Sequence, residues 1–317
     1  MSKKKYSSSG LTDIGELRTL TIRCISETGW FNTAVFLNDV KNGGGLEASQ
    51  YEMPWSDSDV KEGFNGDNRG GYAALIETEG LNGERRCFLL DIGWNEVWME
   101  KRFQEEGLIN PLENGEIEFA FISHEHFDHY WGLPFICKYN PELPLYIPST
   151  FYPEAYRLIE KAGHKGKVVE HKPGYICTLF PGCACFTLDL PVIFRVQGEQ
   201  ILVFRVKDKG LVVVTGCCHP GIINVLEHVR QHIAGEEAIY GIYGGLHISP
   251  FNNWDSSHEG LIQTLGEYNI QQIGCNHCTG IFAIQKMLEA GLPLVTGTGR
   301  NMSQSNLCLG NGDKIVF

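Results

Sequence analysis

The chain has 317 residues, of which 43% are hydrophobic and 20% are charged, a composition typical of a globular protein with a large core. Its formal net charge is −12, from 26 basic and 38 acidic residues, which argues against nucleic acid and anionic membrane surfaces as non-specific partners. Eleven irregularly spaced cysteines, with neither a secretory signal nor an apolar run of about 20 residues, predict a reduced, cytoplasmic protein without a membrane span.

The N-terminal part of the chain mixes polar stretches with one predicted strand. Residues 1–14 predict a disordered tail, and residues 15–317 a single domain. The β-branched run from Leu17 to Ile25 predicts the first strand. Residues 41–70 are rich in Gly, Asn, Asp and Ser and predict a long inserted loop. Its aromatic residues favour a loop that packs over another part of the protein: Tyr51, Trp55 and Phe64.

From Gly71 onward the pattern becomes regular, with strands and helices in alternation. Strands are predicted over 72–77, 87–90, 116–122, 143–147, 211–214, 238–243 and 272–274, with several short strands in 166–210. Helices are predicted over 95–106, 130–139, 153–162, 222–233, 257–268 and 281–290. Two blocks of strands, each flanked by helices, predict two sheets packed face to face with helices outside.

The stretch His124–His129 reads His-Glu-His-Phe-Asp-His and follows the mostly apolar run Ile117–Ile122. Imidazole nitrogens and carboxylate oxygens are ligands for Zn²⁺, Fe and Mn²⁺. His124 and His126 can reach one ion, and Asp128 and His129 a second position nearby. Two ions about 3.5–4 Å apart can clamp and acidify a water. The alternative, a polar helix cap with exposed histidines, does not require three histidines.

Three further histidines follow predicted strands and have glycines close by: His219, His247 and His277. Strand ends of this kind are where α/β proteins collect their sites. Cys217 lies at one of these ends, where it is either a soft metal ligand or a small buried residue.

The remaining histidines and cysteines carry weaker signals. His228 and His232 lie four apart on one predicted helix, as a chelating pair or, with more weight, as part of its surface. Cys275 and Cys278 form a lone Cys-x-x-Cys, a weak zinc or redox signal. Three other histidines are interpreted as surface residues: His164, His171 and His258.

The motif at 123–129, followed by Gly-Leu-Pro, resembles the His-x-His-x-Asp-His signature of the metallo-β-lactamase fold. Asp91-Ile92-Gly93 resembles the Asp-Thr-Gly of that superfamily. The segments Thr-Gly-Cys-Cys-His-Pro-Gly, Gly-Gly-Leu-His and His-Cys-Thr-Gly are similar to a narrower group, named for the archaeal 7,8-dihydropterin-6-yl-methyl-4-(β-D-ribofuranosyl)aminobenzene 5'-phosphate synthase.

This resemblance implies an α/β fold (α+β by some schemes), a four-layer αβ/βα sandwich with one or two metal ions between the sheets. One ion would be held by His124, His126 and His219. The other would be held by Asp128, His129 and His277. Many relatives bridge the ions with an aspartate after a strand-end glycine, but here Gly216 is followed by Cys217. The sequence leaves open whether Cys217 replaces that bridge.

These features predict a metal-dependent hydrolase that uses a metal-activated water on a phosphoester or other small anionic substrate. Its cofactor would be one or two divalent ions, Zn²⁺ first and Mn²⁺ or Fe as alternatives. Asp128 would bind metal and orient the water, and Asp91 would accept a hydrogen bond from a ligand histidine. His247 would donate to the substrate or leaving group, or merely pack at a strand end. Arg300 would pair with an anionic substrate, or lie on the surface.

Two alternatives remain at this point. The first is a transferase that condenses a pterin diphosphate with an aminobenzene ribofuranosyl phosphate. The second is a non-hydrolytic or redox metal-binding protein, although superfamily members with a di-iron centre typically carry Glu in place of His126.

Overall fold

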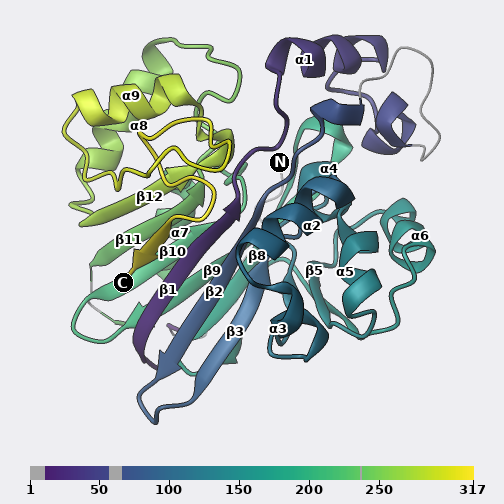
Figure 1. Cartoon of the computed structure of the whole chain (residues 1–317). Helices are drawn as coiled ribbons and strands as arrows, with labels where there is room; N and C mark the ends of the chain where they lie inside the picture. The colour runs from purple at the N-terminus through teal and green to yellow at the C-terminus, as the bar shows by residue number, and fades with distance from the viewer. Residues whose placement is uncertain (1–10, 57–65, 236–237) are drawn as a thin grey trace.

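Two facing groups of strands, with helices on both outer sides, make up the protein, as a computed structural model shows (Figure 1). The structure describes residues 11–56, 66–235 and 238–317. Among these residues the strands follow the order β12-β11-β10-β9-β1-β2-β3-β4-β5-β6, with β13 paired to β1 and the β7–β8 hairpin paired to β9. A single parallel bridge, Leu17 to Val206, joins the two groups. The predicted four-layer sandwich is confirmed.

The first group of strands comprises β1 (Leu17–Ser26), β2 (Ala73–Gly80), β3 (Arg85–Leu90), β4 (Ala120–Phe121), β5 (Leu145–Pro148), β6 (Val168–His171) and β13 (Lys314–Val316). The second comprises β7 (Ile176–Phe180), β8 (Cys183–Pro191), β9 (Gln197–Val206), β10 (Gly210–Thr215), β11 (Ile239–Gly245) and β12 (Gln272–Asn276).

The α-helices are α1 (Thr33–Asn42), α2 (Glu96–Glu105), α3 (Ile109–Glu113), α4 (Phe127–Tyr130), α5 (Leu133–Tyr139), α6 (Pro153–Lys161), α7 (Ile222–His232), α8 (Ser256–Gly266) and α9 (Ile281–Glu289). The short 3₁₀-helices are η1 (Gln50–Glu52), η2 (Pro54–Ser56), η3 (Gly66–Asn68), η4 (Ile193–Arg195) and η5 (His277–Thr279).

Alternating side chains on the strands build the layers. In β2, Ala74 and Ile76 join the core between the two sheets, whereas Leu75 packs toward the helices of the N-terminal half. In β10, Val212 joins the central core and Val213 packs toward α7, α8 and α9. Successive strand residues point to opposite faces, so strands buried on both faces need apolar residues at almost every position.

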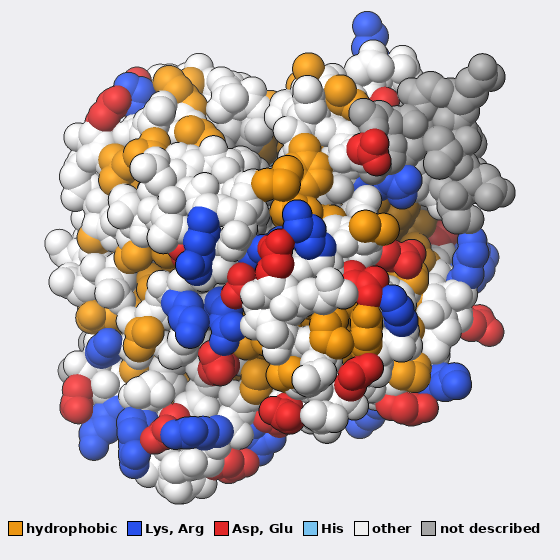
Figure 2. Space-filling model, in the orientation of Figure 1, with side chains coloured by type: hydrophobic (Ala, Val, Ile, Leu, Met, Phe, Trp, Pro, Cys, Tyr) orange, Lys and Arg blue, Asp and Glu red, His pale blue; other side chains and the backbone are white. Residues whose placement is uncertain are grey.

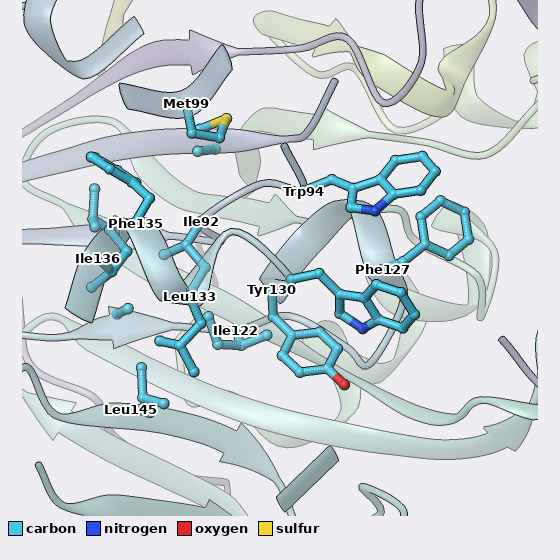
Figure 3. Packing of buried hydrophobic residues seen from close by; sticks show 14 of the residues in the cluster. Ile92, Trp94, Met99, Ile122, Phe127, Tyr130, Leu133, Phe135, Ile136 and Leu145 are labelled. Atoms are coloured by element: carbon cyan, nitrogen blue, oxygen red, sulfur yellow. The ribbon is translucent and has the colours of Figure 1, made fainter. Parts of the chain in front are cut away.

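The outer core of the N-terminal half extends up to the predicted metal motif. Figure 3 shows Phe127 beside Trp94 and Tyr130 beside Ile122, all within one cluster of buried residues. The Phe127 ring lies 4.4 Å from that of Trp94, measured between centroids. Burying a large apolar side chain stabilises the fold by about 1.5–3 kcal/mol. The aromatic residues of the motif therefore anchor it in the buried core of the N-terminal half.

A glutamine on β9 ties the two halves together beside the motif. The backbone N–H of Gln200 donates to the Ser123 carbonyl, at 2.8 Å. Its side-chain Nε2 donates to the carbonyls of Ile122 and Tyr146, at 2.7 and 2.9 Å. Buried backbone carbonyls need hydrogen-bond donors, so these bonds from Gln200 hold the two sheets together at this point.

The predicted tail and loop differ from the structure in part. Residues 1–10 and 57–65, including Phe64, lie outside the described residues. Thr12 bonds backbone to backbone with His232 and Ala234, and Ile14 is buried, so this end of the predicted tail is ordered. Within 41–70, η1, η2 and η3 form, and Trp55 packs 5.0 Å from Phe127, measured between ring centroids. Such packing of the loop was predicted.

On the face of the molecule seen in Figure 2, acidic and basic side chains are interspersed, and neither sign of charge dominates. None of the described helices has the length and apolar character needed to cross a bilayer.

Candidate metal centre

The six-residue motif turns from the end of β4 into α4 and is almost fully buried. His124 and His129 are fully buried, and His126 and Asp128 are 4% exposed. Glu125 points elsewhere: it accepts hydrogen bonds from the Tyr51 hydroxyl and the Tyr152 backbone N–H. Glu125, which alternates with the candidate ligands, thus holds the loop and does not join them.

One group of imidazoles gathers at His124, His126 and His219. Nε2 of His124 lies 2.9 Å from Nδ1 of His126. The His219 ring lies 4.7 Å from that of His124 and 4.9 Å from that of His126, measured between centroids. The structure brings together the three residues predicted for the first ion.

A second group adjoins the first. Nε2 of His129 lies 3.3 Å from Nε2 of His277. The Asp128 carboxylate lies 3.7 Å from Nε2 of His129 and 3.5 Å from Nε2 of His277. These are the three residues predicted for the second ion.

Cys217 lies between the two groups. Its Sγ is 3.2 Å from Nε2 of His129. Ligand atoms of His124, Cys217 and His219 all lie within 4.8 Å of one another, and so do those of His129, Cys217 and His277. One thiol therefore belongs to both donor sets, directly after the strand-end Gly216.

Asp91 orients His129 directly and His124 through Ser123. Its Oδ2 accepts from Nδ1 of His129, at 2.7 Å, and from the Ser123 hydroxyl, at 2.8 Å. That hydroxyl lies 2.8 Å from Nδ1 of His124. Such contacts fix the tautomer and the ring orientation of a metal-binding histidine. The hydrogen bond predicted between Asp91 and a ligand histidine is present.

Glu199 is a residue that the sequence reasoning missed. It is buried on β9 and accepts hydrogen bonds from the backbone N–H groups of Cys217, Cys218 and His219, at 2.7 to 2.9 Å. It also accepts from Nδ1 of His219, at 2.9 Å. Burial alone would raise its pKa, but the hydrogen bonds from His219 and these backbone groups lower it. An acidic residue in an otherwise buried strand was the available signal.

Two other predicted site residues lie in different surroundings. The His247 ring lies 4.4 Å from that of His219, and its donor atoms fall within 4.8 Å of Cys217 and Cys278. Arg300 lies on the C-terminal loop, where it donates to the Gly312 carbonyl, and its side chain is 54% exposed. It is not among the residues that line the cavity at the histidines.

The donor set fits a metal ion on chemical grounds. Burial, and then the neighbouring histidines, hold the pKa values of His124 and His129 well below their usual range, which favours neutral rings with free lone pairs. Nε2 of His219 is buried and has no hydrogen-bond partner among the described residues, while Nδ1 is held by Glu199. Buried polar atoms are rarely left unpaired, so this nitrogen is positioned for a ligand.

Backbone strain gathers around these residues. Asp91, Cys218, His247 and His277 all have positive φ, between 44° and 64°. Residues other than glycine rarely adopt this conformation, which costs of order 1–3 kcal/mol each and clusters at functional sites. Gly216 adds a close approach, because a Cβ there would lie 2.0 Å from Oγ of Ser123.

A narrow cavity of about 20 Å³ opens onto the donors. Its wall is aromatic and includes Trp30, Phe36, Phe194 and Phe251. The free volume holds a water or an ion but no organic substrate.

The layered fold and the buried histidine centre define a metallo-β-lactamase-type protein. The model of the metallo-beta-lactamase superfamily matches residues 66–223, and the chain belongs to that superfamily. The chain is 26% identical, over 69% of its length and 84% of the relative's, to the 7,8-dihydropterin-6-methyl-4-(beta-D-ribofuranosyl)-aminobenzene-5'-phosphate synthase of Methanocaldococcus jannaschii.

Two solved structures share the fold. The first is Tm1679, described as a metal-dependent hydrolase of the beta-lactamase superfamily, with a TM-score of 0.59, 18% identity and coverage of 93% of this chain and 98% of that one. The second is Zn²⁺-bound PqqB from Methylobacterium extorquens, with a TM-score of 0.53, 11% identity and coverage of 93% and 99%.

Proposed function

We propose that the protein is a metal-dependent hydrolase whose substrate is a phosphoester or another small anion. The observation that carries the proposal is the pair of buried donor sets that share Cys217. Superfamily membership supports an enzyme with divalent metal. Bound Zn²⁺, or Mn²⁺ or Fe in its place, would supply positive charge to a developing anion and acidify a water.

The residues of the chain take distinct roles in this proposal. Asp128 directs a carboxylate at the second donor set and orients the nucleophilic water. His247 would donate a proton to a leaving group, a role supported by its position beside His219 and by a buried Nδ1 without a hydrogen-bond partner among the described residues. The aromatic wall excludes bulk water, which strengthens each electrostatic contact inside.

A second candidate is the transferase reaction, favoured by the similarity of the chain to the Methanocaldococcus jannaschii synthase. The same two donor sets would assist loss of diphosphate from a pterin donor. In a redox protein, the third alternative, the bound metal would be a reducible chromophore.

The test uses protein reconstituted with Zn²⁺, Mn²⁺ or Fe²⁺ and the phosphodiester bis(p-nitrophenyl) phosphate. We expect His126→Ala to lose metal and turnover while its circular dichroism spectrum is unchanged. His164→Gln, whose ring bonds to the Leu143 carbonyl away from the centre, is the matched control. Full metal content in His126→Ala would overturn the assignment.

The three candidate functions predict different experimental results. A pterin adduct formed only with a diphosphate donor would establish the transferase. Absence of turnover with any metal, together with a reducible visible chromophore, would establish the redox protein.

A further inference from the structure

A second cluster of metal-binding side chains lies outside the candidate centre. His171 ends β6, Cys177 lies on β7 and Cys185 lies on β8, and their ligand atoms fall within 4.8 Å of one another. The cluster shares no residue with the donor sets around Cys217. His171 was predicted to be a surface residue, but it is 7% exposed, because β6 ends against the β8 hairpin strand.

The strand register creates the cluster. Cys177 and Cys185 are direct partners in the antiparallel β7–β8 pair, so their side chains emerge on the same face. His171 approaches from the other group of strands, with its Nδ1 3.3 Å and its Nε2 4.0 Å from Sγ of Cys185. The three donors thus come from three strands and from both halves of the sandwich.

Gln200 determines which nitrogen of His171 is free. Its Nε2 donates to the carbonyls of Ile122 and Tyr146, so its Oε1 can only accept. Nδ1 of His171 lies 2.8 Å from that oxygen and must therefore carry the proton. The lone pair of the ring is left on Nε2. Metal-binding histidines characteristically have their other ring N–H held in this way.

We propose that His171, Cys177 and Cys185 form a second, mononuclear site for a thiophilic cation such as Zn²⁺. One imidazole and two thiolates are a ligand set that zinc takes, with about 2.0–2.3 Å to each ligand. Binding displaces the two thiol protons to solvent. Cys177 is only partly buried, which leaves the fourth coordination position to water.

An ion at this place would tie β6 to the β7–β8 hairpin. Those elements belong to opposite halves of the sandwich, which are already joined nearby by Gln200. None of its ligands lines the cavity at the histidines, so the ion would stabilise the fold and take no direct part in the reaction.

The test counts zinc in full-length protein dialysed against ZnCl₂ under reducing conditions. We expect the double variant Cys177→Ser/Cys185→Ser to bind one zinc per chain fewer than the control Cys87→Ser/Cys137→Ser, which removes two half-buried thiols outside the cluster. His171→Gln, which keeps both thiols, is expected to lose the same ion. His126→Ala is expected to retain it, so loss of the catalytic metal and loss of this ion are distinguishable.

Equal zinc content in the Cys177→Ser/Cys185→Ser variant and its control would overturn the proposal. So would full zinc content in a folded His171→Gln variant, should the double variant fail to fold. A wild-type mass lower by two hydrogen atoms, with the Cys177 and Cys185 peptides cross-linked, would show a disulfide in place of the ion.

Discussion

Glu199 and His219 are joined by a 2.9 Å hydrogen bond between Oε2 and Nδ1, and the same carboxylate accepts the backbone N–H groups of the turn that carries His219. One side chain thus sets both the path of the turn and the tautomer of the ring. With the proton held on Nδ1, Nε2 faces the other histidines as a lone-pair donor.

Replacing this acid tests that relationship. In Glu199→Gln the amide cannot accept every hydrogen bond that the carboxylate accepts, so His219 loses its fixed tautomer. We expect zinc affinity to fall about 10–100-fold, the usual effect of removing such a partner. Competition with a chromogenic chelator measures it, and Glu289→Gln, in an exposed pair with Lys286, is the control. Unchanged affinity would mean that Glu199 serves only the fold.

We expect Cys217 to determine how many ions the candidate centre holds. Because its thiol belongs to both donor sets, Cys217→Ala should weaken both, and we expect at most one zinc per chain at the candidate centre. Cys217→Asp should restore two, since a carboxylate can bridge the same positions. Elemental analysis after dialysis gives the count, with each variant also carrying Cys177→Ser/Cys185→Ser so that the ion proposed for that separate site does not contribute. Two tightly held ions in Cys217→Ala would contradict a bridging role.

The close approach at Gly216 predicts a stability effect. A Cβ at this position would lie 2.0 Å from Oγ and 2.5 Å from Cβ of Ser123, so Gly216→Ala must displace the residue that holds His124. Overpacking of this kind costs about 1–3 kcal/mol in the free energy of unfolding. Urea denaturation measures it. Gly260→Ala in α8, where a Cβ meets open space, should instead stabilise by roughly 0.5–1 kcal/mol.

His228 predicts a dependence of stability on pH. Burial, and then the nearby His232, lower the pKa of His228 to about 4. An unfolded histidine has a pKa near 6.5, so between about 6.5 and about 4 the unfolded chain binds a proton that the folded chain does not. The free energy of unfolding therefore falls as the pH drops through this window.

The measurement is urea unfolding at pH 4.5 to 7 with a chelator present. We expect His228→Gln to show a shallower pH profile than the wild type. Identical profiles would show that the ring is solvated in the folded protein.

The local part of the site could be predicted from the sequence, because the residues from His124 to His129 lie within one turn after a strand. The three later histidines were found because each follows an apolar run and has a glycine nearby. Glu199 could not be assigned, since its partners lie 18 to 20 residues further along the chain. The pairing of His171 with Cys185 depends on how two sheets cross, which no local pattern records.

The secondary structure, too, could be predicted from the sequence only in part. The predicted strand 116–122 is only Ala120–Phe121 in the structure, although the backbones of Glu118 and Phe119 also bond to β3 and that of Ile122 to β5. The helix Thr33–Asn42 was missed, although Asn32 caps it by accepting from the N–H groups of Ala34 and Val35. That capping signal was readable in the sequence.

The histidines that meet at 3.3 Å, His129 and His277, are 148 residues apart in the chain. Their meeting requires β10, β11 and β12 to be in place beside one another. During synthesis the motif at 124–129 emerges long before its last partner, so a nascent chain offers an ion only part of the centre. If the centre holds ions as proposed, its loading would therefore be a late event, and a fully metallated chain would be one whose sheets have already assembled.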